Sequence, residues 1–435
     1  MEGFNIFIIL IRKAIPIIIS DKPRRGHKTL RLPIPESEYD HFVSDASFAR
    51  KTVDLIFQEN PELFPATFNQ GYVFNGLTIP SIKQGYRCRR IQLKADEESF
   101  CIAPVFVMPY MTAQTKDVEK ILFLRRFNVP FWGLTYISGR NDMFWYRLEQ
   151  SFGRLNIVGT TVKLPEHLPQ DLLADEKHTK LNGNKHYIAM TVAQECILGA
   201  EMTDSASEVA LTKAYGVFAN EACSLKADYT PDTVNTDGWG ATQNAWRYWF
   251  PSITVILCFL HAFIKIRDRA TKALADSFSH AATRVWDAYK AISKASFSQK
   301  LRRLQEWATE NVPESAMKKH ILDLCAKRNR FTKSYAHEHA HRTSNMIDRL
   351  MKFYDRACFS AQYFHGTLTS GQQRVRAWAV LWNFYPSSPK TVKKYGGKIS
   401  PAERLNAKRY ADNWLENLLI SASMNGTRGH QQNPL

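Results

Sequence analysis

Cysteine is scarce in this sequence, and its spacing excludes the structures that paired cysteines usually support. The 435 residues include seven cysteines, an odd number, and no Cys-x-x-Cys pair. A disulfide framework or a structural zinc site would need paired spacing. We therefore expect free thiols in a reducing compartment. The seven are Cys88, Cys101, Cys196, Cys223, Cys258, Cys325 and Cys358.

Long apolar runs are lacking as well. The N-terminal stretch MEGFNIFIILIRKAIPIII is interrupted by Arg12, Lys13 and Pro16, so its apolar pieces are too short to span a bilayer. A signal peptide would begin with basic residues, whereas this chain has Glu2. Two interpretations of residues 1–35 stay open: a buried strand pair, or a start codon assigned too far upstream, with a basic linker after the apolar part.

Positive charge is what the sequence has in excess. Lys and Arg number 58 against 41 for Asp and Glu, which gives a net charge of +17 at pH 7. Such an excess favours a polyanionic partner, nucleic acid before a membrane surface. The alternative is a soluble basic protein without such a partner, because net charge indicates a class of partner and not a fold.

Two small units are predicted before residue 166. Residues 36–110 combine a helical stretch with two strand-like pieces, which the acidic turn ADEES joins as a hairpin. Residues 111–165 contain three short helices: Thr115 caps the first, Pro130 begins the second, and a glycine-bearing turn before Asn141 separates the third. This pattern is typical of a helix-turn-helix module, with a small helical connector as the alternative.

A mixed α/β sheet is predicted next. Three antiparallel-looking strands are joined by an Asn-Gly turn at residues 182–184 and by the tight connection Gln194-Glu195. A helix capped by Ser205, a strand ending at Asp237, a second helix and the buried strand SITVILCF follow. A meander therefore precedes crossover units.

The last part of the chain is predicted to be mostly helical. Lys-rich and Arg-rich helical patterns interrupt the sheet domain and precede a final helix in which Thr343 or Ser344 is the cap. The domain boundaries are 166–268 and 341–390 for the sheet domain, 269–340 for the helical insertion, and 391–435 for a C-terminal helix and tail.

Four arginines are candidate DNA contacts. Arg140 and Arg147 lie at and after the turn of the helix-turn-helix-like module, where the start of a recognition helix can reach base edges. Arg302 and Arg303 lie in the helical insertion without a groove-reading pattern, so contact with backbone phosphates is the simpler role for them.

Three carboxylates stand out by position. Asp175 lies near the end of the first sheet strand, Asp237 ends the fourth, and Asp348 lies one turn into the last helix. Strands one and four are neighbours in a sheet of this order, so the carboxylates can converge, and clustered carboxylates need a cation to offset their repulsion. Local capping or turn roles are the alternative. Rivals for the outer positions are Glu176, Glu338 and Asp355.

These stretches resemble a known family. ADEKHTKLNGNKHYIAMTV, VNTDGWGATQ, CFLHAFIKIRDRA and RTSNMIDRLM look like the characteristic stretches of DDE/D transposases of bacterial insertion sequences. The most specific part is the combination of Asp237, the Cys258-x-x-His261 pair and the block from Thr343 to Arg349. Members often carry Glu at the third acidic position, where this chain has Asp348. Without the resemblance, the Cys-x-x-His pair could be a buried thiol beside a histidine whose ring nitrogens are hydrogen-bonded within the core.

The resemblance implies a fold and an activity. The fold would be a ribonuclease H-like catalytic domain with an all-helical insertion. Asp175, Asp237 and Asp348 would hold two Mg²⁺ ions (Mn²⁺ possible) that promote cleavage of element ends and their joining to target DNA, while Cys258 and His261 help to place the DNA end.

The implied partner is double-stranded DNA, both the terminal inverted repeats and the target. The resemblance further implies a homodimer or higher oligomer on DNA, no membrane partner, and a cytoplasmic, nucleoid-associated protein. Two alternatives remain: a transposase-derived DNA-binding protein with a dead site, and a ribonuclease H-like nuclease without strand transfer.

Overall fold

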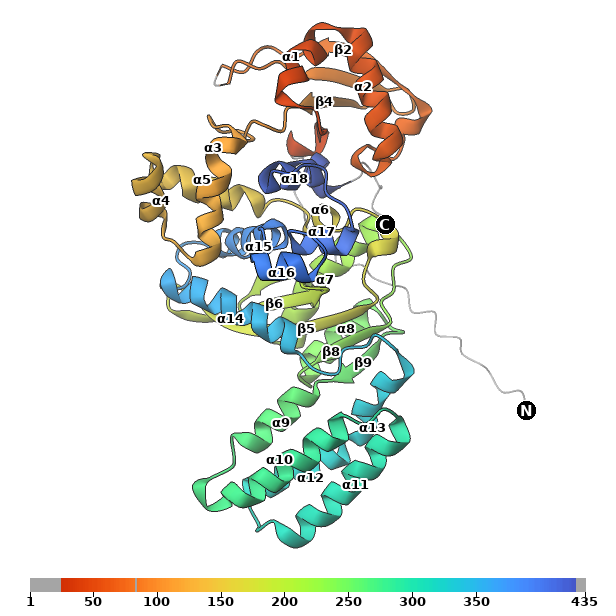
Figure 1. The fold of residues 1–435 in the computed structure, drawn as a ribbon, viewed down its shortest axis with the longest axis vertical. Helices are drawn as coiled ribbons and strands as arrows, with labels where there is room; N and C mark the ends of the chain where they lie inside the picture. The colour runs from red at the N-terminus through yellow and green to blue at the C-terminus, as the bar shows by residue number, and fades with distance from the viewer. Residues whose placement is uncertain (1–24, 83, 428–435) are drawn as a thin grey trace, which may run out of the picture.

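The computed structural model describes residues 25–82 and 84–427. Three parts follow one another along its long axis: a small N-terminal sheet unit, a central α/β layer structure and a helical unit (Figure 1). The apolar part of residues 1–35 lies outside the described residues, so neither interpretation of it is tested. Within the described residues, no helix is long and apolar enough to cross a membrane.

The N-terminal unit is a four-stranded sheet covered by two helices. Its strand order is β1-β4-β3-β2, and the predicted hairpin is confirmed, with Ile91 of β3 opposite Phe100 of β4. Asp45 caps the second helix by accepting from two backbone N–H groups. The elements are β1 (Thr29–Arg31), α1 (Glu36–Ser44), α2 (Ala46–Glu59), β2 (Tyr72–Leu77), β3 (Arg89–Leu93) and β4 (Ser99–Ala103).

Three short helices follow, as predicted. The second has Pro130 as N-cap and Gly139 as a left-handed C-cap, and Asn141 caps the third. The first helix has Gln114 as N-cap, so the prediction of Thr115 is wrong by one residue. The Thr115 hydroxyl instead donates to Glu416 at 2.6 Å. The helices are α3 (Thr115–Phe123), α4 (Phe131–Ser138) and α5 (Asp142–Phe152), with α6 (Ile157–Thr161) after them.

The central sheet has the strand order β7-β6-β5-β8-β9. The meander β5-β6-β7 is antiparallel, whereas β5-β8 and β8-β9 are parallel, so the predicted neighbourhood of strands one and four is confirmed. Both hairpin turns have two residues with positive φ, Asn182-Gly183 and Gln194-Glu195, which matches the twist of antiparallel strands. The strands are β5 (Asp171–Leu181), β6 (Asn184–Ala193), β7 (Cys196–Thr203), β8 (Thr233–Thr236) and β9 (Thr254–Leu257).

Helices cover both faces of this sheet, and alternation along β5 decides which side chain faces which layer. Leu172 and Ala174 pack with α7 (Glu208–Leu225) and α8 (Gly240–Trp249) on one face. Leu173 packs on the other face with α5, α14 (Asn345–Ser360) and α15 (Leu368–Phe384). The cap of α7 is Ser207 rather than the predicted Ser205.

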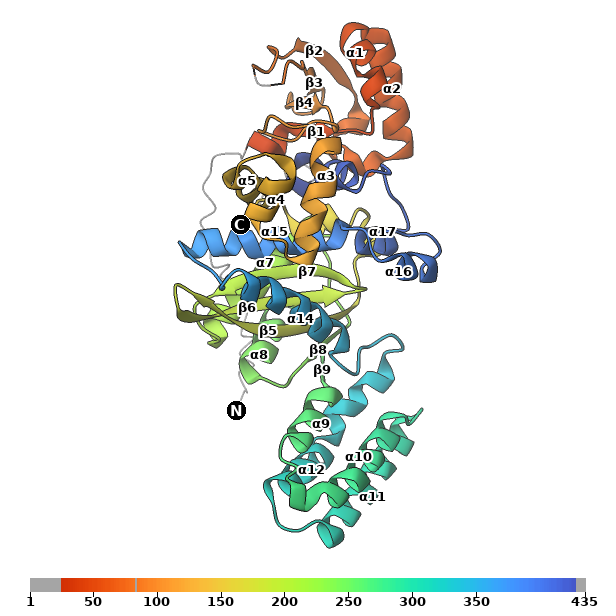
Figure 2. The ribbon, with the colours of Figure 1, turned by 60° about the vertical axis from the view of Figure 1, so that its left-hand side comes forward.

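A helical unit with its own apolar core is inserted between β9 and α14. It extends away from the sheet beyond β8 and β9 (Figure 2), and its helical character agrees with the prediction. Its main helices are α9 (Phe259–Arg267), α10 (Ala275–Tyr289), α11 (Lys294–Asn311), α12 (Ala316–Ala326) and α13 (Arg328–Phe331).

The C-terminal part returns to the N-terminal side of the molecule. Instead of one predicted helix it contains α16 (Pro389–Lys394), α17 (Pro401–Asn406) and α18 (Trp414–Ser421). The last of these contacts α3 and β1, so the chain end ties the N-terminal unit to the central layers.

Candidate metal centre

Asp175 lies on β5 at the point where its parallel neighbour β8 ends. The pairing runs from Asp171 opposite Thr233 to Leu173 opposite Asn235. Asp175 is thus two residues past the last parallel pair, on the Leu173 face of the sheet. The expectation that it lies near the strand end is wrong, because pairing with β6 extends β5 to Leu181.

Asp348 reaches this position from the first turn of α14, on the same face. The segment before the helix is fixed to the sheet and to α9: Asn235 donates to the His341 carbonyl at 2.9 Å, and the Phe259 N–H donates to the Arg342 carbonyl at 3.0 Å. Ser344 is the N-cap residue of α14, as one of the two predicted options. Its hydroxyl donates to Asp348 Oδ2 at 2.6 Å.

The Cys-x-x-His pair opens α9 and meets the same serine. Cys258 is the N-cap residue and His261 lies on the first turn, and a spacing of three residues directs both side chains to one face of a helix. The Ser344 N–H donates to Cys258 Sγ at 3.3 Å, and Ser344 Oγ lies 3.3 Å from His261 Nδ1. Ser344 therefore links the pair to Asp348.

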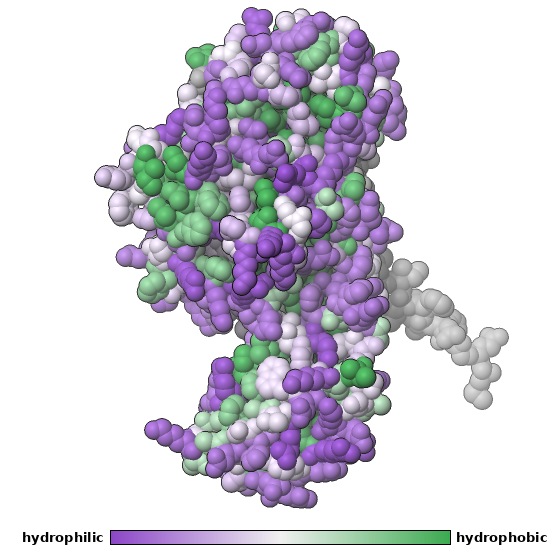
Figure 3. All heavy atoms as spheres, viewed as in Figure 1, coloured by the Kyte–Doolittle hydropathy of each residue, from purple (hydrophilic) through white to green (hydrophobic). Residues whose placement is uncertain are grey.

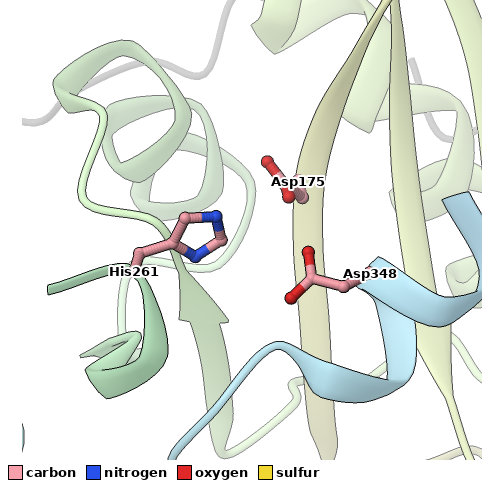
Figure 4. Close-up of side chains that lie close together, drawn as sticks. All are labelled: Asp175, His261 and Asp348. Atoms are coloured by element: carbon pink, nitrogen blue, oxygen red, sulfur yellow. The ribbon is translucent and has the colours of Figure 1, made fainter. Parts of the chain in front are cut away.

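Asp175, His261 and Asp348 converge, as Figure 4 shows. One possible ligand atom from each residue lies within 4.8 Å of those of the other two, and all three residues are half-buried. Such a group could hold a metal ion. It joins a strand, the helix after β9 and the helix after the insertion, so it exists only in the folded chain.

Asp237 lies beside this group but is not part of it. Continuing the β5-β8 register by two residues would bring it level with Asp175. Gly238 has a φ of +104°, and a Cβ there would come within 2.6 Å of Leu257, so only glycine fits this turn. The Asp237 side chain accepts from the Trp239 N–H at 2.8 Å. The sequence predicted a group of three aspartates, and the structure brings His261 in at the third corner.

The electrostatics of the group favour a cation. Burial raises the pKa of Asp175 to about 6; His261 opposes this rise, and the charges of Asp237 and Asp348 add to it. Contact with Cys258 raises the pKa of His261 to about 9 against the effect of burial, and Asp175 and Asp348 contribute. The raised pKa of His261 and the raised pKa of Asp175 both show that the two carboxylates gain from a nearby positive charge, which a divalent ion could supply.

The rival acids do not join the group. Glu176 points to the opposite face, where its carboxylate accepts from Tyr215 at 2.6 Å and Thr242 at 2.7 Å. Burial raises its pKa to about 7. Asp355 pairs with Lys177 at 2.6 Å, and Glu338 is exposed outside the group.

The four arginines predicted to contact DNA differ in whether their side chains are already bonded within the protein. Arg140 donates to the Thr112 carbonyl at 3.0 Å and lies over the Phe144 ring, so it is engaged within the helical module. Arg147, Arg302 and Arg303 are exposed, and within the described part of the chain none of them forms an ion pair or side-chain hydrogen bond.

The surface of the helical module was not anticipated. Beside its arginines, α4 and its flanks expose apolar and aromatic side chains, seen as green spheres over α4 and α5 (Figure 3). An apolar exposed helix is unlike a surface that reads base edges by hydrogen bonds, which leaves the exposed Arg147 of the next helix as the candidate for that role. The exposed side chains are Phe127, Trp132, Tyr136, Ile137 and Met143.

The sequence did not identify two residues as members of the site, Ser344 and His261. Ser344 was considered as a helix cap and as part of the block from Thr343 to Arg349, and His261 was expected to help place the DNA end; neither was predicted as a direct neighbour of the metal ligands. The signal for Ser344 was its spacing of four residues from Asp348, which places the two on one helix face. No family model and no curated protein matches the chain.

Proposed function

We propose that this chain is a DNA transposase that cleaves the ends of a mobile element and joins them to target DNA by metal-dependent phosphodiester chemistry. The observation that carries the proposal is the convergence of Asp175 and Asp348, with Asp237 alongside, at the point where β8 ends beside β5 in a mixed sheet. The net charge of +17 supports a nucleic acid as the substrate.

The sheet topology supports a ribonuclease H-like catalytic domain. An antiparallel meander of three strands is followed by two parallel strands on the β5 side, in the order β7-β6-β5-β8-β9. Helices lie on both faces, and a helical unit interrupts the domain before the helix that carries Asp348. These features agree with the resemblance of the sequence to DDE/D transposases.

The residues present fit a divalent cation. Half-buried carboxylates, one with a raised pKa, gain from a nearby positive charge. The oxygen donors of Asp175 and Asp348 suit Mg²⁺ or Mn²⁺. When bound, such ions activate the attacking oxygen and stabilise charge on the leaving oxygen.

The chain's own residues have separable roles in this proposal. Asp175 and Asp348 would hold the metal, with Asp237 as the further carboxylate beside them. The Ser344 hydroxyl donates a hydrogen bond to Oδ2 of Asp348 and so fixes the orientation of that carboxylate. Cys258 keeps Ser344 in place, and His261 offers a cationic side chain where a DNA phosphate would approach.

The test uses DNA that flanks the gene. Labelled duplexes from both flanks are incubated with the full chain and Mg²⁺ or Mn²⁺, together with an unlabelled target plasmid, and products are separated on denaturing gels. We expect cut ends and joined products with the wild type, and neither with Asp175→Asn. Asp355→Asn, which removes a carboxylate outside the group, should act like the wild type.

Each other outcome has a defined meaning. Cutting without joining would favour a nuclease without strand transfer. Specific binding to the flanks without any cutting would favour a DNA-binding protein with a dead site. Activity that survives in EDTA would contradict metal-dependent chemistry.

A further inference from the structure

A pocket of about 280 Å³ lies where the helical unit meets the sheet, next to the candidate metal centre. Asp237 and Cys258 line it from the sheet side and the start of α9, and Lys265, Lys327 and Arg330 line it from the helical unit. Its volume is close to the lower end of the roughly 300–1,000 Å³ typical of ligand pockets.

The positive charges of the pocket are available to a ligand. Lys265 and Lys327 are exposed, and neither has an ion-pair or hydrogen-bond partner among the side chains of residues 25–82 and 84–427. Arg330 donates to Gln243 at 2.5 Å, which holds its guanidinium at the wall. The ammonium groups of the two lysines are therefore hydrated by solvent and free to contact an anion.

Two acids also line the pocket, fewer than its three side chains from lysine and arginine. Asp323 lies 3.9 Å from His320 Nδ1, and Asp237 accepts from the Trp239 N–H. The pocket therefore combines free cations from the helical unit with a carboxylate beside the metal centre. This excess of basic over acidic side chains favours an anionic ligand.

The pocket is also connected to the metal centre by contacts. Cys258 lines the pocket and accepts from the Ser344 N–H, and the Ser344 hydroxyl donates to Asp348. A group bound in the pocket thus lies one side chain away from the serine that orients a proposed metal ligand. The helical unit supplies one wall, so the pocket exists only when this unit and the sheet are packed together.

We propose that this pocket binds a backbone phosphate of the DNA strand that is cut, with Lys265 and Lys327 as its cationic contacts. The inference rests on the proposed function, because it takes DNA to be the substrate. A lysine is a compact point charge on a flexible stem and suits a phosphate whose angle of approach varies. Such a contact fixes the position of the strand without reading its sequence.

The test compares two double variants of the full chain. The first double variant, Lys265→Ala with Lys327→Ala, removes both unpaired lysines from the pocket. The second, Lys290→Ala with Lys294→Ala, removes two positive charges from exposed positions of the helical unit outside the pocket. Binding of a fluorescein-labelled duplex from the gene's flank is measured by anisotropy in EDTA, at several salt concentrations. Circular dichroism checks that each variant is folded.

The pocket variant should bind the duplex about tenfold more weakly at low salt, and its plot of log affinity against log salt should be flatter by about two phosphate contacts. The control variant should change both quantities much less. Equal weakening of the two variants, or no weakening of either, would overturn the proposal.

Cleavage separates this inference from the proposed function. With Mg²⁺ and saturating duplex, a positioning role predicts that the pocket variant still cuts about tenfold more slowly than the wild type, because misplaced substrates react slowly. If the wild type cuts and joins and the pocket variant has normal affinity and rate, the pocket assignment fails alone. If the wild type neither cuts nor joins, the proposed function fails, and the binding comparison still decides the pocket.

Discussion

Replacing Asp175 by Asn should stabilise the metal-free protein while removing its response to metal. Burial raises the pKa of this carboxyl from 3.8 to about 6, so the folded state disfavours its ionised form. Each pKa unit corresponds to about 1.4 kcal/mol, which gives a cost of about 3 kcal/mol for the ionised side chain in the folded state. Asparagine has nearly the same shape and carries no charge.

The stability gained by Asp175→Asn should increase as the pH rises. A carboxyl whose folded-state pKa is raised costs nothing below its unfolded value of 3.8, and the cost grows until pH exceeds about 6. Asp175→Asn should therefore melt close to the wild type near pH 4 and on the order of 5 °C higher at pH 7.5 in EDTA. Added Mn²⁺ should raise the melting temperature of the wild type but not that of Asp175→Asn.

Melting curves followed by circular dichroism at several pH values would measure this. Asp355→Asn is the matched control, since it removes a carboxylate that is ion-paired with Lys177 on the same face, and a partly exposed pair of this kind contributes about 1 kcal/mol or less. If Asp175→Asn melted at or below the temperature of the wild type in EDTA at pH 7.5, the ionised Asp175 carboxylate would not destabilise the metal-free fold, and this explanation would be refuted.

Further predictions concern the surrounding residues. Ser344→Ala should lower the rate of Mg²⁺-dependent cleavage while duplex affinity stays within about twofold, because it frees a proposed ligand from a hydrogen bond to a charged group worth about 1.5–3 kcal/mol; an unchanged rate would remove Ser344 from the site. Asp237→Asn should abolish cleavage and leave gel-shift binding of the flanks near normal, and collapse of binding in a folded variant would make Asp237 structural. Arg147→Ala should reduce discrimination between flank and random duplexes, whereas replacing Arg302 and Arg303 together should weaken both and reduce the salt slope by about two; equal effects of the two changes on discrimination would contradict separate roles.

The strands and their turns could be predicted because their signals are local. Asn182-Gly183 tolerates positive φ and fixes the register of β5 and β6. The extent of β5 could not be predicted in the same way. Its pairing with β6 continues well past the end of β8, so Asp175 lies in mid-strand, and strand length here depends on partners rather than on the residues of the strand.

The site was predictable in part for the same reason. The first turn of α14 identified Asp348, and the neighbourhood of strands β5 and β8 identified Asp175, although its expected place at the end of β5 was wrong. The arrival of His261 as the third member depends on contacts between α9 and the start of α14, where His261 and Ser344 are 83 residues apart in the sequence and the helical insertion lies between them. Two serines near one helix start carry equal local signals, which is why Ser205 was predicted where Ser207 is the cap.

Direct measurement of Mn²⁺ binding tests the central claim that Asp175 and Asp348 form a metal site. The free-ion signal in electron paramagnetic resonance is followed during titration of the full chain without DNA. We expect the wild type and Asp355→Asn to remove Mn²⁺ from solution equally, and Asp175→Asn and Asp348→Asn each to lose this binding. Unchanged Mn²⁺ binding in both Asp175→Asn and Asp348→Asn would show that these aspartates do not form a metal site.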